Sequence, residues 1–131
     1  MVSNMEISME FYVKLGFEQK MDWKPNGRTE WCWLERGKVA LMLQEYSKDF
    51  HPTGTSGQGV SICFMCDDAL KLYHEFLQNG LSPEEPFVGN NMWVTSLQDP
   101  DGYRLDFESA TDVAEETTYS DWLEKNKEDQ H

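Results

Sequence analysis

The order of apolar and polar positions predicts one helix followed by three strands, twice over. Apolar residues at helical spacing predict a helix at residues 7–15, with Asn4 as its N-cap and Gly16 as the residue that ends it. Segments with the alternation or β-rich composition of strands follow at 17–23, 29–35 and 39–45. A second set comprises a strand at 60–66, a helix at 69–79 and strands at 83–88, 92–98 and 103–109. The sequence therefore predicts an internal repeat.

The two copies differ where they begin. The second copy starts with a full strand, whereas the first has only residues 1–3 before its helix. We therefore expect an α+β fold of two βαβββ modules in which the first strand is short or truncated. Such a sheet is short of an edge partner, which favours pairing with another chain. Eight strands in this order are expected to form a half-open, barrel-like cup whose concave side is the natural ligand site.

The expected organisation is one domain, 1–109, followed by a tail. Module 1 covers 1–45, and module 2 covers 59–109. A linker rich in Gly, Ser, Thr and Pro joins them at 46–58. In the acidic tail, 110–131, three apolar residues have the spacing of one stripe of a short helix: Tyr119, Trp122 and Leu123. The alternative for this tail is a loosely docked terminus.

The charge of the chain narrows its range of partners. The 131 residues include 24 Asp and Glu against 11 Lys and Arg, a formal net charge of −13. Such a chain repels nucleic acids and anionic membranes and attracts cations, unless the charge serves solubility alone. No apolar run is long enough to span a membrane, and the N-terminus has no signal-peptide pattern. Together with the presence of only three cysteines, these features predict a cytoplasmic protein in a reducing compartment.

Two motifs resemble those of a known superfamily. Residues 8–17, Ser-Met-Glu-Phe-Tyr-Val-Lys-Leu-Gly-Phe, resemble the S-x-x-F-Y-x-x-L-G-F helix of the glyoxalase, bleomycin-resistance and extradiol-dioxygenase (vicinal oxygen chelate) superfamily. Residues 99–105, Asp-Pro-Asp-Gly-Tyr-Arg-Leu, resemble its D-P-D-G-x-x-L turn. The resemblance covers about residues 1–109 and implies the doubled βαβββ fold. It says little about chemistry, because one fold hosts many functions.

The resemblance also implies where enzymes of this superfamily hold a divalent metal, namely on the first and last strands of each module. In this chain the last-strand position of module 1 falls at Met42, or at Leu41, and the first-strand position of module 2 falls at Ser61. The last-strand position of module 2 falls at Asp106, and the remaining position would precede Val2. Only Asp106 has a suitable side chain. We therefore expect no bound metal, no cofactor and no catalytic residue.

Aromatic and acidic side chains are the candidates for ligand binding. Trp31 and Trp33 share a face of one strand, and Trp93 lies on the corresponding strand of module 2, unless these rings pack in the core. Asp106 and Glu108 share a face of the last strand and would attract a cation, unless that face is turned to solvent. The predicted ligand-binding set is Trp31, Trp33, Met42, Gln44, Ser61, Trp93, Asp106 and Glu108.

The C-x-x-C pattern of Cys63 and Cys66 has a simpler interpretation than a metal site. On a strand, residues three apart point to opposite faces, so the two thiols cannot jointly hold zinc. We expect both cysteines to be packed in the core.

Three functions from different classes are compatible with these features. The first is a metal-free binding protein of the bleomycin-resistance type, which sequesters an aromatic or cationic small molecule and, as the resemblance implies, confers antibiotic resistance and forms a homodimer. The second is a divergent metal-dependent glyoxalase-like lyase or dioxygenase. The third is a protein-interaction module whose partner completes the first strand. A measurement of bound metal separates the first two, and poor stability as an isolated monomer marks the third.

Overall fold

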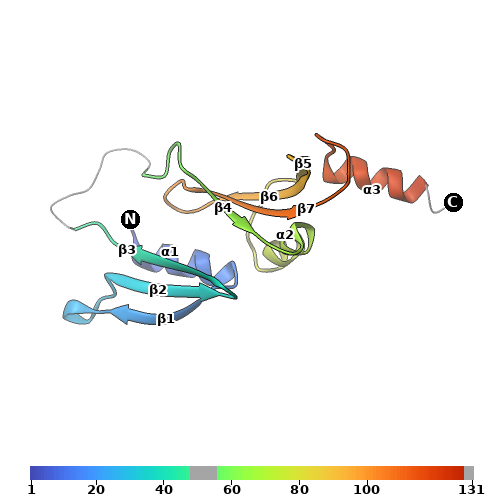
Figure 1. The fold of residues 1–131 in the computed structure, drawn as a ribbon. Coiled ribbons are helices and arrows are strands. Elements are labelled where there is room, and N and C mark those ends of the chain that lie inside the picture. The colour runs from blue at the N-terminus through green and yellow to red at the C-terminus, as the bar shows by residue number, and fades with distance from the viewer. Residues whose placement is uncertain (48–55, 129–131) are drawn as a thin grey trace. The chain divides into compact units, whose positions relative to one another are not determined.

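The computed structural model describes residues 1–47 and 56–128, which belong to two compact units (Figure 1). Unit 1 contains Met1–Val60 together with Asp99–Tyr103, and unit 2 contains Ser61–Gln98 together with Arg104–His131. Most of the predicted linker at 46–58 lies outside the described residues.

Unit 1 contains a helix and a three-stranded antiparallel sheet in the order β1-β2-β3. Its elements are α1 (Met5–Lys14), β1 (Glu18–Trp23), a 3₁₀ turn (Pro25–Gly27), β2 (Trp31–Arg36) and β3 (Val39–Gln44). Val2 forms a single parallel bridge with Glu45, beside β3. The Val2 N–H donates to the Gln44 carbonyl at 2.8 Å, and the Tyr46 N–H donates to the Val2 carbonyl at 3.1 Å. The predicted short first strand is therefore present as one bridge.

The helix of unit 1 begins at Met5, two residues before the predicted start, and ends at Lys14, one residue before the predicted end. The Asn4 side chain accepts a hydrogen bond from the Ile7 N–H at 3.2 Å, which satisfies one of the free donors of the first turn. The buried residues are Met5, Ser8, Tyr12 and Leu15. Val13 of the same helix is exposed. Because Ser8 finds a hydrogen-bond partner inside unit 1, a polar residue replaces an apolar one on this face.

The turn Asp99–Tyr103 provides that partner and fixes α1 in place. The Tyr12 hydroxyl donates to the Asp99 carboxylate at 2.8 Å, and the Ser3 N–H donates to Asp101 at 3.0 Å. Burial, together with the nearby Asp99 charge, raises the pKa of Tyr12 well above its ordinary value. The two motifs that carry the family resemblance thus contact one another, which gives both of them a structural role.

Gly57 shows how closely the chain approaches this turn. Its N–H donates to the Asp101 carbonyl at 2.8 Å, and a Cβ at this position would lie 2.2 Å from the Tyr103 backbone nitrogen. Any residue larger than glycine would displace the turn that holds α1.

Unit 2 repeats the arrangement with a complete first strand. Its elements are β4 (Ser61–Met65), α2 (Ala69–Gln78), β5 (Phe87–Gly89), β6 (Met92–Gln98), β7 (Arg104–Ala110) and α3 (Tyr119–Glu128). The sheet order is β4-β7-β6-β5, with β4 parallel to β7 and the other pairs antiparallel. In unit 1 the corresponding order is Val2, β3, β2, β1, again with a parallel first pair. The predicted repeat is therefore confirmed in the connectivity. The described residues form two separate sheets, and the eight-stranded cup stays a prediction.

The core of unit 2 lies between its sheet and its two helices. Phe107 of β7 stacks on Phe64 of β4 and meets Phe76 of α2 edge-on, with ring centroids 4.9 and 5.0 Å apart. The tail packs against the β5 and β6 side of this core. Tyr119 and Trp122 of α3 contact the cluster that contains Trp93, which confirms two members of the predicted apolar stripe, whereas the third, Leu123, is exposed. The Val88 N–H donates to the Thr117 carbonyl at 2.9 Å, so the segment before α3 covers part of the β5 edge.

Candidate ligand-binding faces of the two sheets

The sheet of unit 1 presents large apolar side chains on the face opposite α1. Cys32 of β2 is buried and contacts Met5 of α1 through their sulfur atoms, 3.9 Å apart. Because successive strand residues point to opposite faces, Trp31 and Trp33 lie on the other face. The strand register sets two rows across the sheet, the first made of Met21, Trp33 and Met42 and the second of Trp23, Trp31 and Gln44. We call these six residues the tryptophan face.

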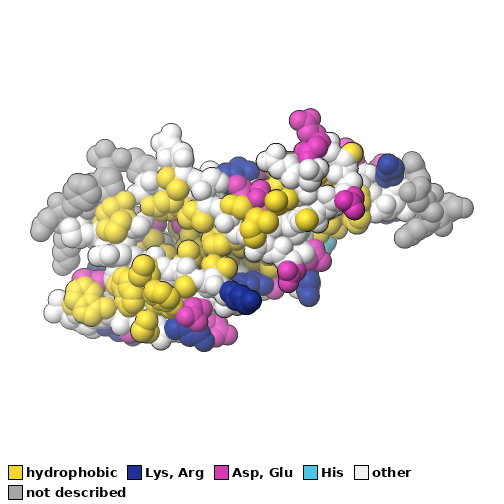
Figure 2. All heavy atoms as spheres, viewed as in Figure 1, with side chains coloured by type: hydrophobic (Ala, Val, Ile, Leu, Met, Phe, Trp, Pro, Cys, Tyr) yellow, Lys and Arg dark blue, Asp and Glu magenta, His cyan; other side chains and the backbone are white. Residues whose placement is uncertain are grey.

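The tryptophan face is largely open to solvent. Met21, Trp23 and Met42 are 54%, 57% and 61% exposed, and the other two tryptophans are half-buried. Figure 2 shows hydrophobic side chains gathered over the β1–β2–β3 sheet. Single exposed apolar side chains are common on protein surfaces and need no explanation. A contiguous apolar patch of this kind, by contrast, marks an interaction site. The sheet therefore offers flat aromatic area and flexible thioethers to a partner.

Carboxylates border the tryptophan face. The Trp33 indole N–H donates to Glu35 at 2.9 Å, which fixes the orientation of this ring. A hollow of about 580 Å³ lies beside Trp23 and Gln44, and its lining also includes Glu30, Arg28 and Glu45. Arg28 is paired with Glu45, and among the described residues Glu30 has no ion pair. The hollow therefore places two carboxylates next to an aromatic ring, a combination that favours cations.

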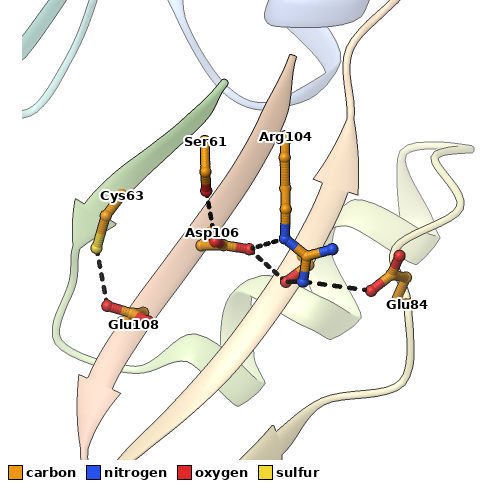
Figure 3. Close-up of polar contacts among 7 residues, drawn as sticks. Ser61, Cys63, Glu84, Arg104, Asp106 and Glu108 are labelled. Atoms are coloured by element: carbon orange, nitrogen blue, oxygen red, sulfur yellow. Dashed lines mark hydrogen bonds and ion pairs between the residues drawn. The ribbon is translucent and has the colours of Figure 1, made fainter. Parts of the chain in front are cut away.

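The corresponding face of unit 2 is polar and internally hydrogen-bonded. Asp106 of β7 accepts from the Ser61 hydroxyl at 2.8 Å, from the Ser96 hydroxyl at 2.6 Å and from the Arg104 Nε at 3.0 Å (Figure 3). Arg104 also lies 3.6 Å from Glu84. We call the side of β4, β7 and β6 that carries these residues the carboxylate face; it is exposed along β4, whereas Val94 and Ser96 of β6 are buried.

These contacts change the expected role of Asp106. A carboxylate has about four lone-pair sites, and three of them are occupied here. Its negative charge is matched by the adjacent Arg104 guanidinium. Asp106 is therefore poorly placed to attract a cationic ligand or to ligate a metal, because either would compete with an existing cation.

Glu108 has a different neighbour. Its Oε2 lies 2.8 Å from the Sγ of Cys63, whose thiol is the donor. Partial burial of the sulfur and the hydrogen bond to Glu108 raise the pKa of Cys63 to about 11, so the thiol is protonated at neutral pH. Cys63 is exposed on this face, and Cys66 lies half-buried beside the Glu108 carbonyl. The two thiols point apart as predicted, but packing in the core is wrong for Cys63.

The structure separates the eight predicted ligand-binding residues into three groups. Trp31, Trp33, Met42 and Gln44 lie on the tryptophan face. Ser61, Asp106 and Glu108 lie on the carboxylate face. Trp93 belongs to neither, because residues 93, 95 and 97 of β6 point toward α2. Its ring is 5% exposed and packs with Ala69, Val88 and α3, so the expected stacking role is replaced by a core position.

Several residues of these faces were missing from the predicted set, among them two of β1, one of β7 and one of β4. Met21 and Trp23 lie on β1, where a β-bulge between Gln19 and Met21 interrupts the simple alternation. Arg104 precedes Asp106 by two residues, and this spacing alone places both on one face of β7. Cys63 stands in the same relation to Ser61 on β4. Strand alternation could therefore have revealed the last two.

Two properties of the described residues bear on metals and membranes. Within residues 1–47 and 56–128, no group of three or more His, Cys, Asp or Glu side chains is arranged to hold a metal ion. In the same ranges, none of the helices has the length and apolar character needed to span a lipid bilayer.

Two units of equal strand order, each with a helix on one side of its sheet and an open face on the other, define a duplicated α+β protein. The sequence matches the family model of the Glyoxalase/Bleomycin resistance protein/Dioxygenase superfamily over residues 1–107, and the chain belongs to this superfamily. The match ends before α3.

Solved structures of similar fold include antibiotic-binding proteins. A bleomycin resistance determinant encoded on the transposon Tn5 superposes with a TM-score of 0.65 at 20% identity, covering 84% of this chain and 91% of its own. TnmS3, an antibiotic binding protein from Streptomyces sp. CB03234, gives a TM-score of 0.66 at 19% identity, with coverages of 84% and 89%. A putative glyoxalase from Bacillus halodurans gives 0.59 at 16% identity, with coverages of 82% and 89%. At such identities the likeness shows the fold alone. No curated protein sequence matches the chain.

Proposed function

We propose that this chain is a metal-free small-molecule binding protein that sequesters a planar aromatic ligand carrying positive charge. The observation that carries the proposal is the tryptophan face, with three indole rings and two thioethers on one open side of a three-stranded sheet. Glu35 and Glu30 border this face and supply negative charge. The names of two structural neighbours, a bleomycin resistance determinant and an antibiotic binding protein, support a ligand of this class.

In this proposal the ligand contacts the residues of unit 1 first. Stacking on Trp31 and Trp33 uses rigid rings at low entropic cost, and Met21 and Met42 adapt to the edges of the ligand. Ser61 and Asp106, which the sequence places among the ligand-binding residues, instead belong to the hydrogen-bond network of the carboxylate face. The expected homodimer and cytoplasmic location are further parts of the proposal. Light scattering of the purified protein tests the dimer, and fractionation of the producing cells tests the location.

The direct test is a titration followed by tryptophan fluorescence and calorimetry, with bleomycin and a cationic acridine dye as probes. We expect saturable binding without turnover of either compound. Trp33→Ala removes a ring at the centre of the first row and should weaken binding about five- to thirtyfold, which corresponds to roughly 1–2 kcal/mol for an anchoring aromatic residue. Trp33→Phe should retain more affinity than Trp33→Ala.

A matched control uses a tryptophan that lies outside the tryptophan face. Trp122→Phe changes a ring of α3 outside the tryptophan face and should leave the affinity unchanged. Equal losses in Trp33→Ala and Trp122→Phe would show that the effect is not local to the tryptophan face. Elemental analysis completes the test, because a divalent metal at one per chain would favour the metal-dependent lyase or dioxygenase instead.

A further inference from the structure

Strand β4 brings two sulfur atoms together on the carboxylate face. Cys63 and Met65 are two residues apart, so their side chains share one side of the sheet. The Cys63 Sγ and the Met65 Sδ lie 4.0 Å apart. Both side chains are exposed, and β4 is the edge strand of its sheet, so an ion has free access to the sulfur pair.

Glu108 adds an oxygen donor to this pair from the neighbouring strand. Its carboxylate lies 2.8 Å from the Cys63 sulfur, and Figure 3 shows the two side chains pointing toward each other. In the register of β4 and β7, Glu108 is also the direct partner of Met65. One thiol, one thioether and one carboxylate therefore converge from two adjacent strands.

We propose that Cys63, Met65 and Glu108 form a binding site for a soft monovalent cation of the Cu(I) or Ag(I) type. Thiolate and thioether sulfur are the donors that select such ions, whereas Mg²⁺ and Ca²⁺ require several oxygens. On binding, the Cys63 thiol releases its proton to solvent and a sulfur–metal bond forms in its place. No atom changes oxidation state, and the Glu108 carboxylate offsets the charge of the ion.

This site differs from the metal position implied by the superfamily. That position falls at Ser61 and Asp106, where Arg104 already provides a cation within 3.0 Å of the carboxylate. The sulfur pair begins at Cys63, two residues after Ser61 on β4, and its donors include the thioether of Met65. The inference therefore stands independently of the proposed ligand-binding function.

The test uses Ag(I), added as silver nitrate to the reduced full chain in chloride-free buffer and followed by calorimetry and native mass spectrometry. We expect one tight equivalent per chain. Cys63→Ser should abolish this event, and Met65→Leu should weaken it at least tenfold. Both positions are exposed, so thermal unfolding of the variants should resemble that of the original chain.

Two controls separate a built site from a reactive thiol. Met42→Leu changes an exposed methionine of unit 1, and Cys66→Ser changes the cysteine on the opposite side of the chain; both should leave the tight event intact. Unchanged affinity in Met65→Leu would overturn the proposal, because Cys63 would then bind silver alone. Retention of the tight event in Cys63→Ser, or its loss in Cys66→Ser, would overturn it as well.

Discussion

The open faces of the two sheets have the same place in the connectivity and opposite chemistry. In unit 1 the face carries Trp23, Trp31 and Trp33 with two methionines, and much of this apolar area is exposed. In unit 2 the face carries Arg104 and Asp106, joined by two serines into one hydrogen-bond network. One face offers contacts that a partner must complete, and the other has largely satisfied its polar groups internally.

This difference shows how two copies of a repeated unit can keep the same arrangement of helix and strands while the side chains on one face of the sheet change. The helix-facing positions of both sheets are buried and mostly apolar, because they form the cores. The open positions carry no such constraint, so they can acquire rings in one copy and charges in the other. Tryptophan placement illustrates the point, since Trp33 of β2 lies on an open face and Trp93 of the corresponding β6 lies in a core.

The largest effect is expected from exchanging a tryptophan for alanine in each unit. Trp93→Ala removes a ring packed against Tyr119 and Trp122 and should lower the free energy of unfolding by about 3–5 kcal/mol. Trp23→Ala removes an exposed ring and should change it by no more than about 0.5 kcal/mol. Urea unfolding measured by circular dichroism gives both values.

Equal losses of unfolding free energy in Trp93→Ala and Trp23→Ala would contradict the proposed difference between the two sheet faces. A large loss in Trp23→Ala would mean that the tryptophan face is covered in the folded protein. The apolar patch would then stabilise the fold or an assembly instead of receiving a ligand. Light scattering on the same variant distinguishes these two cases, because loss of an assembly lowers the molar mass.

A smaller effect is expected from the network of the carboxylate face. Arg104→Met leaves Asp106 without its cation and should lower the free energy of unfolding by about 1–2 kcal/mol, less than for a fully buried pair because Arg104 is partly exposed. Adding Asp106→Asn to this variant should recover part of the loss, since the amide carries no unpaired charge and its oxygen still accepts from the serine hydroxyls. Additive losses in the double variant would show that the two side chains are not coupled.

The turn that fixes α1 predicts a pH dependence in unit 1. Tyr12→Phe removes the hydrogen bond to Asp99 and should cost about 1 kcal/mol at neutral pH. Because the pKa of Tyr12 is raised in the folded state, its stabilisation is complete below about pH 10 and is lost as the pH rises above that value. Thermal unfolding between pH 8 and 11 should therefore show a steeper decline for the original chain than for Tyr12→Phe. Parallel declines would show that Tyr12 is not the group responsible.

Local rules were sufficient for the elements and for the repeat. Strand boundaries agreed within about two residues for most elements, and Asn4 caps its helix as predicted. Alternation placed Asp106 with Glu108 and Trp31 with Trp33, because a period of two is a property of the strand itself. It could not say which face of β6 meets α3, so a core position for Trp93 was left as an alternative to ligand stacking. It placed Arg104 and Asp106 on one face of β7 but could not show that the two side chains are in contact, since that depends on side-chain conformation.

The smallest expected effect tests whether the helices α1 and α2 contribute equally to the stability of the two units. Asn4 accepts from the Ile7 N–H at 3.2 Å, and Asp68 accepts from the Lys71 N–H at 3.0 Å, so each helix has one capped donor in its first turn. Asn4→Ala and Asp68→Ala should each lower the free energy of unfolding by about 0.5–1 kcal/mol, and by similar amounts. The capping hydrogen bond supplies most of the effect at 0.5 M salt, because the charge of Asp68 is then largely screened from the helix dipole. If the Asp68 variant lost several times more free energy of unfolding than the Asn4 variant under these conditions, the two helices would not play equivalent roles. The units would then differ in how their helices stabilise them, and not only in the side chains on their sheet faces.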